Sequence, residues 1–177
     1  MNMMEESTTK PLLTGMFSDR ESAERAYGTL HEKGYTKDDV NLFMSDETRK
    51  RHFAGDKSDM GTKAMEGMGA GSAIGGAIGA LAGIIASVGT SIVLPGLGLV
   101  IAGPIAAGLA GAGAGGITGG LIGALVGWGI PEHHAKKYEA GIREGKIVMG
   151  VHPKNAEDAR HLENTWRQHK AEDIYVH

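Results

Sequence analysis

Hydrophobic positions in the first part of the chain follow the pattern of a strand, a helix and a second strand. An apolar run over residues 11–17 predicts a buried strand, and alternating apolar positions over 39–45 predict another. Between them, apolar residues recur at helical spacing up to Gly34, where the helix is expected to end. Ser18 and Glu21 have the spacing of a capping box, so we expect the helix to begin there.

The same order returns in the last part of the chain. A helix is predicted over 135–144, a strand over 146–152, a helix capped by Asn155, and a strand over 173–177. Joined to the first part, these segments give strand-helix-strand, a short helix, then strand-helix-strand, which predicts an α+β fold. That order is typical of a split ferredoxin-like βαβ-αβαβ sandwich, an antiparallel sheet with helices on one face.

Residues 67–131 interrupt this sandwich with 65 residues that contain no Asp, Glu, Lys, Arg or His, and 21 of them are glycine. Small residues at every fourth position share one helix face and let two helix backbones approach closely, as in helix association within lipid. A flexible linker is the alternative, but linkers lack a fixed period, and Ile, Leu and Val fill the spaces here. The expected self-assembly residues are Gly67, Gly71, Gly75, Gly79 and Gly83 in a first run, and Gly111, Gly115, Gly119, Gly123 and Gly127 in a second.

The two glycine runs are symmetric about Leu97, which lies within a turn signal. We therefore expect a long antiparallel glycine-zipper helical hairpin. The connection, residues 90–103, is strongly apolar. Because a large apolar patch usually marks a contact, lipid or other copies of the chain should cover it. The expected hairpin tip is Leu94, Pro95, Gly96, Leu97 and Gly98.

This organisation divides the chain into four segments. Residues 1–45 and 132–177 are expected to form the two halves of the ferredoxin-like domain, 46–60 a connection or short surface helix, and 61–131 the apolar helical hairpin. Within the connection, residues 49–51 are basic, and we expect a solvated surface there, with contact to anionic lipid headgroups as the alternative.

Length and the absence of charge permit each arm of the hairpin to cross a membrane. About 27 residues give about 40 Å of helix, against a hydrocarbon core of about 30 Å. Glycine and alanine make each arm only weakly hydrophobic, so the expected membrane unit is a paired hairpin or a ring of hairpins. A water-soluble assembly that buries the tips inside itself is the alternative.

Composition narrows the partners and the location. A formal net charge of −3 without a strongly basic run argues against nucleic-acid binding. The absence of cysteine excludes disulfides and thiolate metal sites. Residues 1–9 contain Glu5 and Glu6 and have no apolar core, so no signal peptide is predicted. We expect the protein at the cytoplasmic face of a membrane, or in the cytoplasm as a large soluble assembly.

Candidate chemistry is sparse, and we predict no catalytic residue, no cofactor site and no metal site, hence no enzyme. His133 and His134 are adjacent, and neighbours on a helix point in different directions. Glu157, His161 and His169 share a helix face without the spacing typical of zinc ligands. Solvated surface is the expectation for both groups.

Gly15 and Gly150 fall in strands that are central neighbours in the ferredoxin-like order. Glycine within a strand marks the close approach of a ligand or of another part of the protein. We expect packing, with room left for Trp166 or Tyr27 above the sheet. Binding of a small effector, or dimerisation edge to edge, is the alternative.

Segments on both sides of the insert resemble a known family. Residues 17–23, 30–34 and 39–42, then 138–142 and 145–149, are similar to the bacterial general stress proteins, described as heat-induced or low-temperature-induced. The resemblance implies a small ferredoxin-like domain, in some members with a glycine-rich apolar insert. It also implies a stress-linked bacterial protein without a known catalytic site.

These observations together predict a non-enzymatic stress-response protein that forms a homo-oligomer through its glycine zipper. As a membrane-associated scaffold it would stabilise or remodel a lipid bilayer. One alternative is a soluble homo-oligomeric sensor or ligand-binding module whose hairpins form an internal core. A pore-forming assembly ranks lower, because the uncharged hairpin offers no ion-selective ring of charges.

Overall fold

The computed structural model describes residues 11–53, 91–94, 98–104 and 120–177. Most of the predicted self-assembly residues lie outside this part of the chain: the first glycine run, and Gly111, Gly115 and Gly119 of the second. Pro95, Gly96 and Leu97 of the expected tip also lie outside it.

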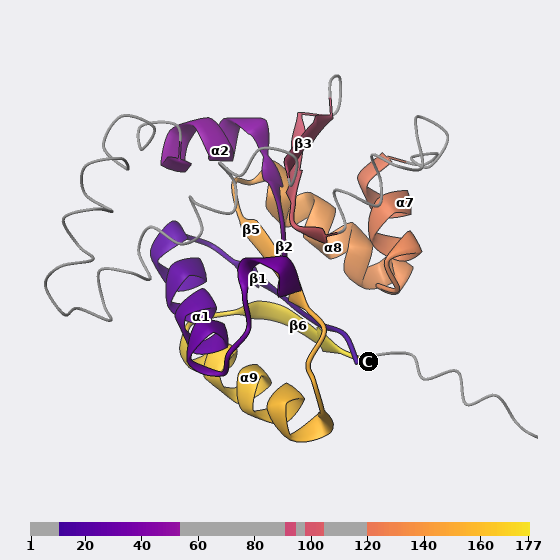
Figure 1. Ribbon diagram of the computed structural model, residues 1–177. Coiled ribbons are helices and arrows are strands. Elements are labelled where there is room, and N and C mark those ends of the chain that lie inside the picture. Colours follow the sequence, from indigo (N-terminus) through magenta and orange to yellow (C-terminus); the bar gives the residue numbers. More distant parts are fainter. Residues whose placement is uncertain (1–10, 54–90, 95–97, 105–119) are drawn as a thin grey trace, which may run out of the picture.

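The described chain is an α+β fold built on one antiparallel sheet (Figure 1). The six strands are ordered β3-β4-β2-β5-β1-β6, and every neighbouring pair is antiparallel. In chain order the elements are β1 (Leu13–Phe17), α1 (Arg20–Glu32), the short 3-10 helix η1 (Lys37–Asp39), β2 (Val40–Ser45), α2 (Asp46–Phe53), β3 (Ser91–Leu94), β4 (Leu99–Ala102), α7 (Gly120–Gly127), α8 (Glu132–Arg143), β5 (Ile147–Val151), α9 (Ala156–Gln168) and β6 (Glu172–Val176).

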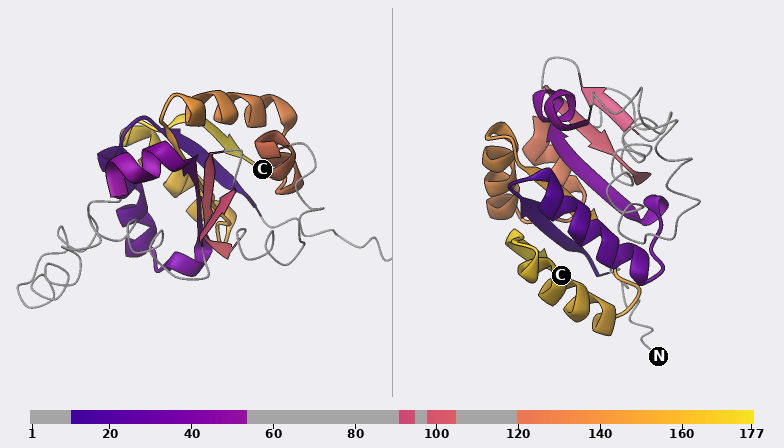
Figure 2. Two further views of the ribbon diagram at one scale, coloured as in Figure 1. Left: turned by 90° about the horizontal axis from the view of Figure 1, so that it is seen from above. Right: turned by 90° about the vertical axis from the view of Figure 1, so that its left-hand side faces the viewer.

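Helices cover both faces of the sheet, which corrects the expectation of helices on one face only. On one face, α1 and α9 enclose a core that includes Phe17 and Trp166, whose rings meet edge to face at 5.6 Å. On the other face, α7 and α8 enclose a second core that includes Phe43, Leu125 and Tyr138, all fully buried. Figure 2 shows α8 and α9 on opposite sides of the strands. The second core exists because α8 and the end of the apolar insert both pack on the sheet.

The middle of the apolar insert forms a β-hairpin, so the connection expected over residues 90–103 contains two paired strands as well as the predicted turn. Leu94 ends β3 and Gly98, with φ 59°, precedes β4, so the predicted turn connects two strands and not two helices. β4 also pairs with β2. The physical reason is the sequence around the turn, where β-branched and large apolar residues favour a pleated sheet over a helix.

The four side chains of β4 are at most 2% exposed because this chain's own sheet and cores cover them. Val100 and Ala102 join the core beneath α1 and α9, while Leu99 and Ile101 join the core beneath α7 and α8. This alternation is that of a strand buried on both faces. The expectation that lipid or another copy must cover the tip is therefore wrong for β4.

The beginning of α1 also differs from the prediction. Asp19 is the N-cap, and its carboxylate accepts a hydrogen bond of 2.7 Å from the backbone N–H of Ser22. The Ser18 hydroxyl instead donates to Glu172 of β6 over 2.6 Å. A carboxylate at the cap is favoured because it also interacts with the positive end of the helix dipole.

Most of the other predicted elements are confirmed, with small shifts at their ends. The core face of α1 is buried as expected, and Asn155 caps α9 by accepting from the backbone N–H of Asp158. The helix expected over 135–144 begins earlier, at Glu132 directly after Pro131. In β5, Ile147, Met149 and Val151 share one core as predicted.

Candidate functional site

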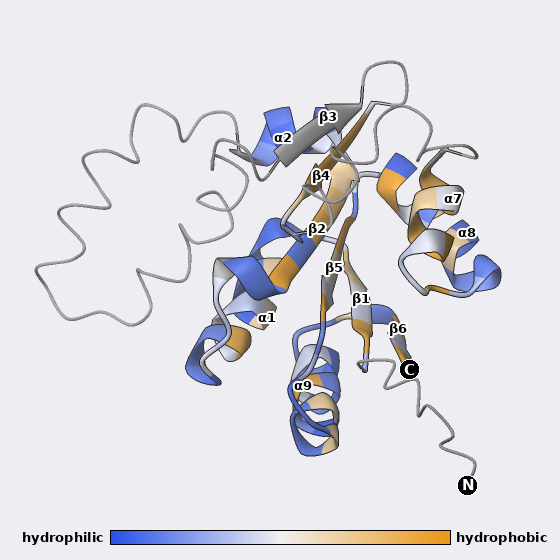
Figure 3. Cartoon of the chain, turned by 45° about the vertical axis from the view of Figure 1, so that its right-hand side comes forward, coloured by the Kyte–Doolittle hydropathy of each residue, from blue (hydrophilic) through white to orange (hydrophobic). Residues whose placement is uncertain are grey.

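Helix α7 is the one segment with predicted self-assembly residues in helical form among the residues described. Leu121, Ala124 and Leu125 are buried against the sheet and hold the helix there. The opposite side carries Gly127, around which an added Cβ would meet no atom of the described chain within 4 Å, and Val126, which is 44% exposed. In Figure 3, α7 lies beside α8 and carries apolar residues, which are drawn in orange. The apolar anchor and the bare backbone of α7 therefore lie on different sides.

A cleft of about 640 Å³ opens where β2, β4 and β5 meet the segment that follows α7. We call it the Trp128 cleft. Pro104 follows β4 and Trp128 follows α7, so the cleft lies where the apolar insert leaves the sheet and returns to it. The described residues that line it are Pro11, Asp38, Asp39, Asn41, Pro104, Trp128, His152, Pro153 and Lys154.

The indole of Trp128 is held in place by close packing on Gly150. A Cβ added at Gly150 would lie 2.0 Å from the Cη2 atom of Trp128. The ring also contacts Phe43 at 5.5 Å and meets His152 edge to face at 5.9 Å. The predicted packing role of Gly150 is thus confirmed with Trp128 as the partner, whereas Trp166 covers Gly15 as expected, 3.0 Å from an added Cβ.

The polar side chains of the cleft come from the ends of the central strands β2 and β5 and from η1. Asn41 of β2 is 3% exposed and lies opposite Gly150 of β5. His152 follows β5, and its Nδ1 lies 3.1 Å from the carbonyl oxygen of Pro11. The carboxylate of Asp39 accepts from the backbone N–H of Thr36 over 2.7 Å, which fixes the first turn of η1.

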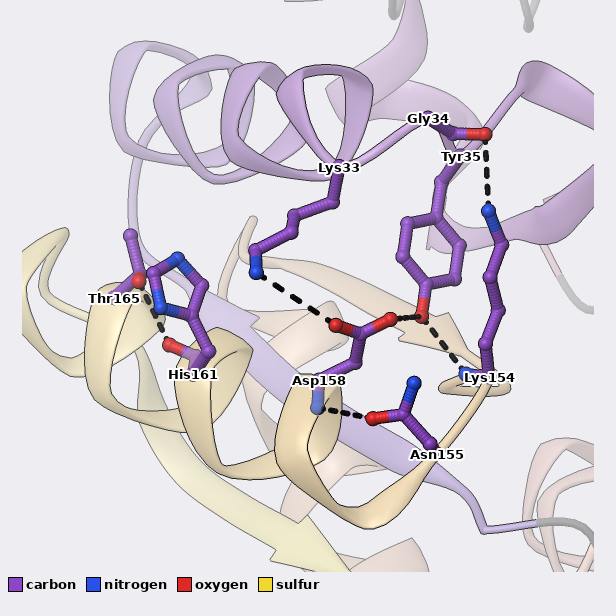
Figure 4. A network of polar contacts seen from close by, with 8 residues as sticks. All are labelled: Lys33, Gly34, Tyr35, Lys154, Asn155, Asp158, His161 and Thr165. Atoms are coloured by element: carbon purple, nitrogen blue, oxygen red, sulfur yellow. Dashed lines mark hydrogen bonds and ion pairs between the residues drawn. The ribbon is translucent and has the colours of Figure 1, made fainter.

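A network around Tyr35 fastens the loop before β2 to the loop after β5 (Figure 4). The buried Tyr35 hydroxyl donates to the Asp158 carboxylate over 3.1 Å and accepts from the backbone N–H of Lys154 over 2.8 Å. Burial raises the pKa of Tyr35 above its ordinary value. Lys33 adds an ion pair of 3.7 Å to Asp158. The network positions Lys154, whose ammonium lies 4.6 Å from the centre of the Tyr35 ring and donates to the Gly34 carbonyl oxygen.

Replacing Tyr35 by phenylalanine should lower the free energy of unfolding by about 1–3 kcal/mol, because the Asp158 carboxylate and the Lys154 N–H lose their shared partner. Urea unfolding followed by circular dichroism measures the change. Tyr175→Phe is the matched control, since that ring is partly exposed, and a change below about 0.5 kcal/mol is expected there. Equal losses in the two variants would contradict the role given to the network.

A second polar cluster lies between α8 and β6. The hydroxyl of Tyr138 donates to the Asp173 carbonyl oxygen over 2.7 Å and lies 2.8 Å from the Thr14 hydroxyl, and burial raises the pKa of Tyr138 well above its ordinary value. Desolvation lowers the pKa of His134, whose Nδ1 is buried and has no hydrogen-bond partner within the described chain. The adjacent His133 ring lies 4.3 Å away. Across the described residues, no three His, Cys, Asp or Glu side chains are grouped so as to hold a metal ion.

The basic residues 49–51, for which contact with lipid headgroups was the alternative to a solvated surface, lie on α2 and are paired within that helix. Arg49 and Lys50 both contact the Asp46 carboxylate at 2.8 Å, and Arg51 contacts Glu47 at 2.6 Å. Their charges are thus partly neutralised locally. Within the part of the chain that the structure describes, no helix has the length and apolar character needed to cross a membrane.

Comparisons of the chain with known protein families, with curated proteins and with solved structures gave no match. Sequence reasoning identified Gly150 but missed Trp128, Asn41 and Lys154. The signal that could have found the cleft was a tryptophan within a segment otherwise built from small apolar residues.

Proposed function

We propose that this protein is a non-enzymatic stress-response scaffold that self-assembles through its glycine runs and associates with a membrane from the cytoplasmic side. The observation that carries the proposal is the arrangement of α7, whose bare glycine backbone lies away from the sheet. A helix fixed to the domain on one side and free of side chains on the other suits close packing against another small-residue helix. The resemblance to general stress proteins supports the stress-linked role.

The β-hairpin changes the geometry of this proposal. The first glycine run lies between α2 and β3, and the second lies between β4 and α7. Each run therefore begins and ends in the sequence at an element packed on the sheet. Self-assembly then uses two separate glycine-rich segments per copy, in place of one hairpin with a distant tip. The flanking strands, ordered β2-β5-β1-β6, support the split ferredoxin-like arrangement proposed for the domain that carries these segments.

Leucine at Gly127 should break the assembly into smaller species, because a bulky side chain prevents contact between helix backbones. The substitution leaves the fold intact, since an added Cβ at Gly127 meets no atom of the described chain within 4 Å. Val126→Leu, at a position that is already apolar and exposed, is the matched control. Light scattering with and without detergent measures particle size.

Three further variants extend this test along the sequence. Gly75→Leu and Gly119→Leu belong to the two glycine runs and should act like Gly127→Leu, whereas Gly55→Leu in the connection should leave the size unchanged. Unchanged particles in all the zipper variants would overturn self-assembly through glycine. Recovery of the particle in the high-speed supernatant without detergent would overturn the membrane association and leave the self-assembly in place.

The Trp128 cleft favours a second candidate, a soluble homo-oligomeric ligand-binding module. The cleft combines an indole with an amide, two carboxylates and an ammonium group. Binding sites for small molecules have this character, an apolar wall with a few placed polar groups. In this candidate the glycine runs would form the internal core of the oligomer, and the domain would carry the ligand.

A further inference from the structure

We propose that the Trp128 cleft binds a small organic cation, with a quaternary ammonium group as the best match. This inference rests on the second candidate function, the ligand-binding module, and gives it a ligand class. Two features of the cleft carry it: two exposed carboxylates and an aromatic wall that is held by close packing.

The described side chains that line the cleft include two exposed carboxylates. Asp38 and Asp39 supply two carboxylates, and both are exposed. Within the described chain neither carboxylate has an ion-pair partner, because the ion pairs there join other residues. Lys154 also lines the cleft, and its ammonium lies over the Tyr35 ring and donates to the Gly34 carbonyl oxygen. Two carboxylates against one ammonium leave the described lining with a net negative charge.

The wall of the cleft suits an apolar cation better than a strongly hydrated one. Trp128 has the aromatic ring that attracts cations most strongly. Its ring is braced by Gly150, Phe43 and His152, so it cannot rotate away without disturbing the sheet. Three prolines, at residues 11, 104 and 153, add apolar surface without backbone N–H donors. Among the described residues an anionic ligand would find few donors and two repelling carboxylates, which is why the cation is favoured.

The cleft also carries polar side chains from two elements, β2 and η1, which can fix the orientation of a ligand. Asn41 of β2 is 3% exposed and lines the cleft, which Asp38 and Asp39 of η1 also line. A ligand that carries a hydroxyl beside its ammonium group would place the hydroxyl toward the Asn41 amide and the cation between Trp128 and the two carboxylates. Choline has both groups and is the appropriate probe.

Titration calorimetry of the full chain with choline tests this proposal against the neutral alcohol of the same shape, in which carbon replaces nitrogen. Choline is expected to bind about tenfold more tightly than the neutral alcohol, because only the charged form gains from the indole and the carboxylates. Asp38→Asn and Trp128→Leu should each weaken choline binding by about tenfold. Glu157→Gln, which removes an exposed carboxylate on α9 outside the cleft, should change nothing.

Four results would overturn the proposal. One is equal affinity for choline and the neutral alcohol, another is the absence of choline binding at millimolar concentration, and the third is unchanged binding in Asp38→Asn. Binding of acetate or inorganic phosphate that is lost in Lys154→Gln would show an anion site and would also overturn it. Particle size, measured on the same samples by light scattering, reports on the glycine runs separately, so failure of the cleft and failure of self-assembly are distinguishable.

Discussion

Alanine at Gly103 should lower the free energy of unfolding by about 2–4 kcal/mol and release β4 from β2. Gly103 follows β4 and has φ 109°, a backbone conformation that a side chain disfavours. Its added Cβ would lie 2.2 Å from the carbonyl oxygen of Val40 and 2.9 Å from Oδ1 of Asn41. The nearer atom belongs to the backbone of a central strand, so no side-chain rotation relieves the overlap. Urea unfolding gives the loss of stability.

Hydrogen exchange locates the effect, because the amides of β4 should exchange faster in the Gly103 variant than in the wild-type protein. Gly98→Ala is the matched control. Gly98 also has a positive φ, 59°, but its added Cβ meets no atom of the described chain within 4 Å, so only the backbone preference is lost, about 1 kcal/mol. Losses of equal size in both variants would contradict the close packing of β4 against β2.

Valine at Gly150 is expected to displace the Trp128 indole and to cost about 1–3 kcal/mol of stability. The added Cβ would overlap the Cη2 and Cζ3 atoms of Trp128, at 2.0 and 2.5 Å. β5 lies between β1 and β2 in the sheet, so its backbone cannot move away, and the indole must. Tryptophan fluorescence should shift to longer wavelength as Trp128 enters water, while Trp166 stays buried.

A double-mutant cycle separates this cause from a general intolerance of valine in β5. In a Trp128→Ala background the cost of Gly150→Val should shrink by about 1 kcal/mol or more, because the clash has been removed in advance. The same cost in both backgrounds would show that Trp128 does not pack on Gly150. Choline binding should fall in both single variants, since each removes the aromatic wall from the cleft.

The flanking elements were predictable because their signals are local. Helical spacing of apolar residues, the Asn155 cap and the turn at Gly34 depend on neighbours in sequence, and all of them are present in the structure. The prediction of Ser18 as the cap of α1 was wrong, also for a local reason. Serine and aspartate stand side by side at residues 18 and 19, and a capping-box pattern alone does not rank them.

The β-hairpin within the insert was not predictable from spacing alone. Glycine at every fourth residue suggested helices on both sides of Leu97, and a turn between helices has the same sequence as a turn between strands. The choice between helix and strand depends on the pairing partner. β4 forms a strand because it pairs with β2 and its side chains pack into the cores on both faces of the sheet. The Trp128 cleft is likewise formed by residues that are far apart in sequence. Asn41 and His152 come together only because β2 and β5 are neighbours in the sheet.

The strand order has a consequence for how the protein is made. β1 lies between β5 and β6, and both of these are translated after the whole insert. β2 has a partner much sooner, because β4 leaves the ribosome before either of them. The nascent chain can therefore pair β2, β4 and β3 first, while β1 waits for the last strands. Such long-range pairing slows folding and leaves apolar surface exposed until β5 and β6 have been made. The nascent chain is therefore most prone to aggregation during its own synthesis.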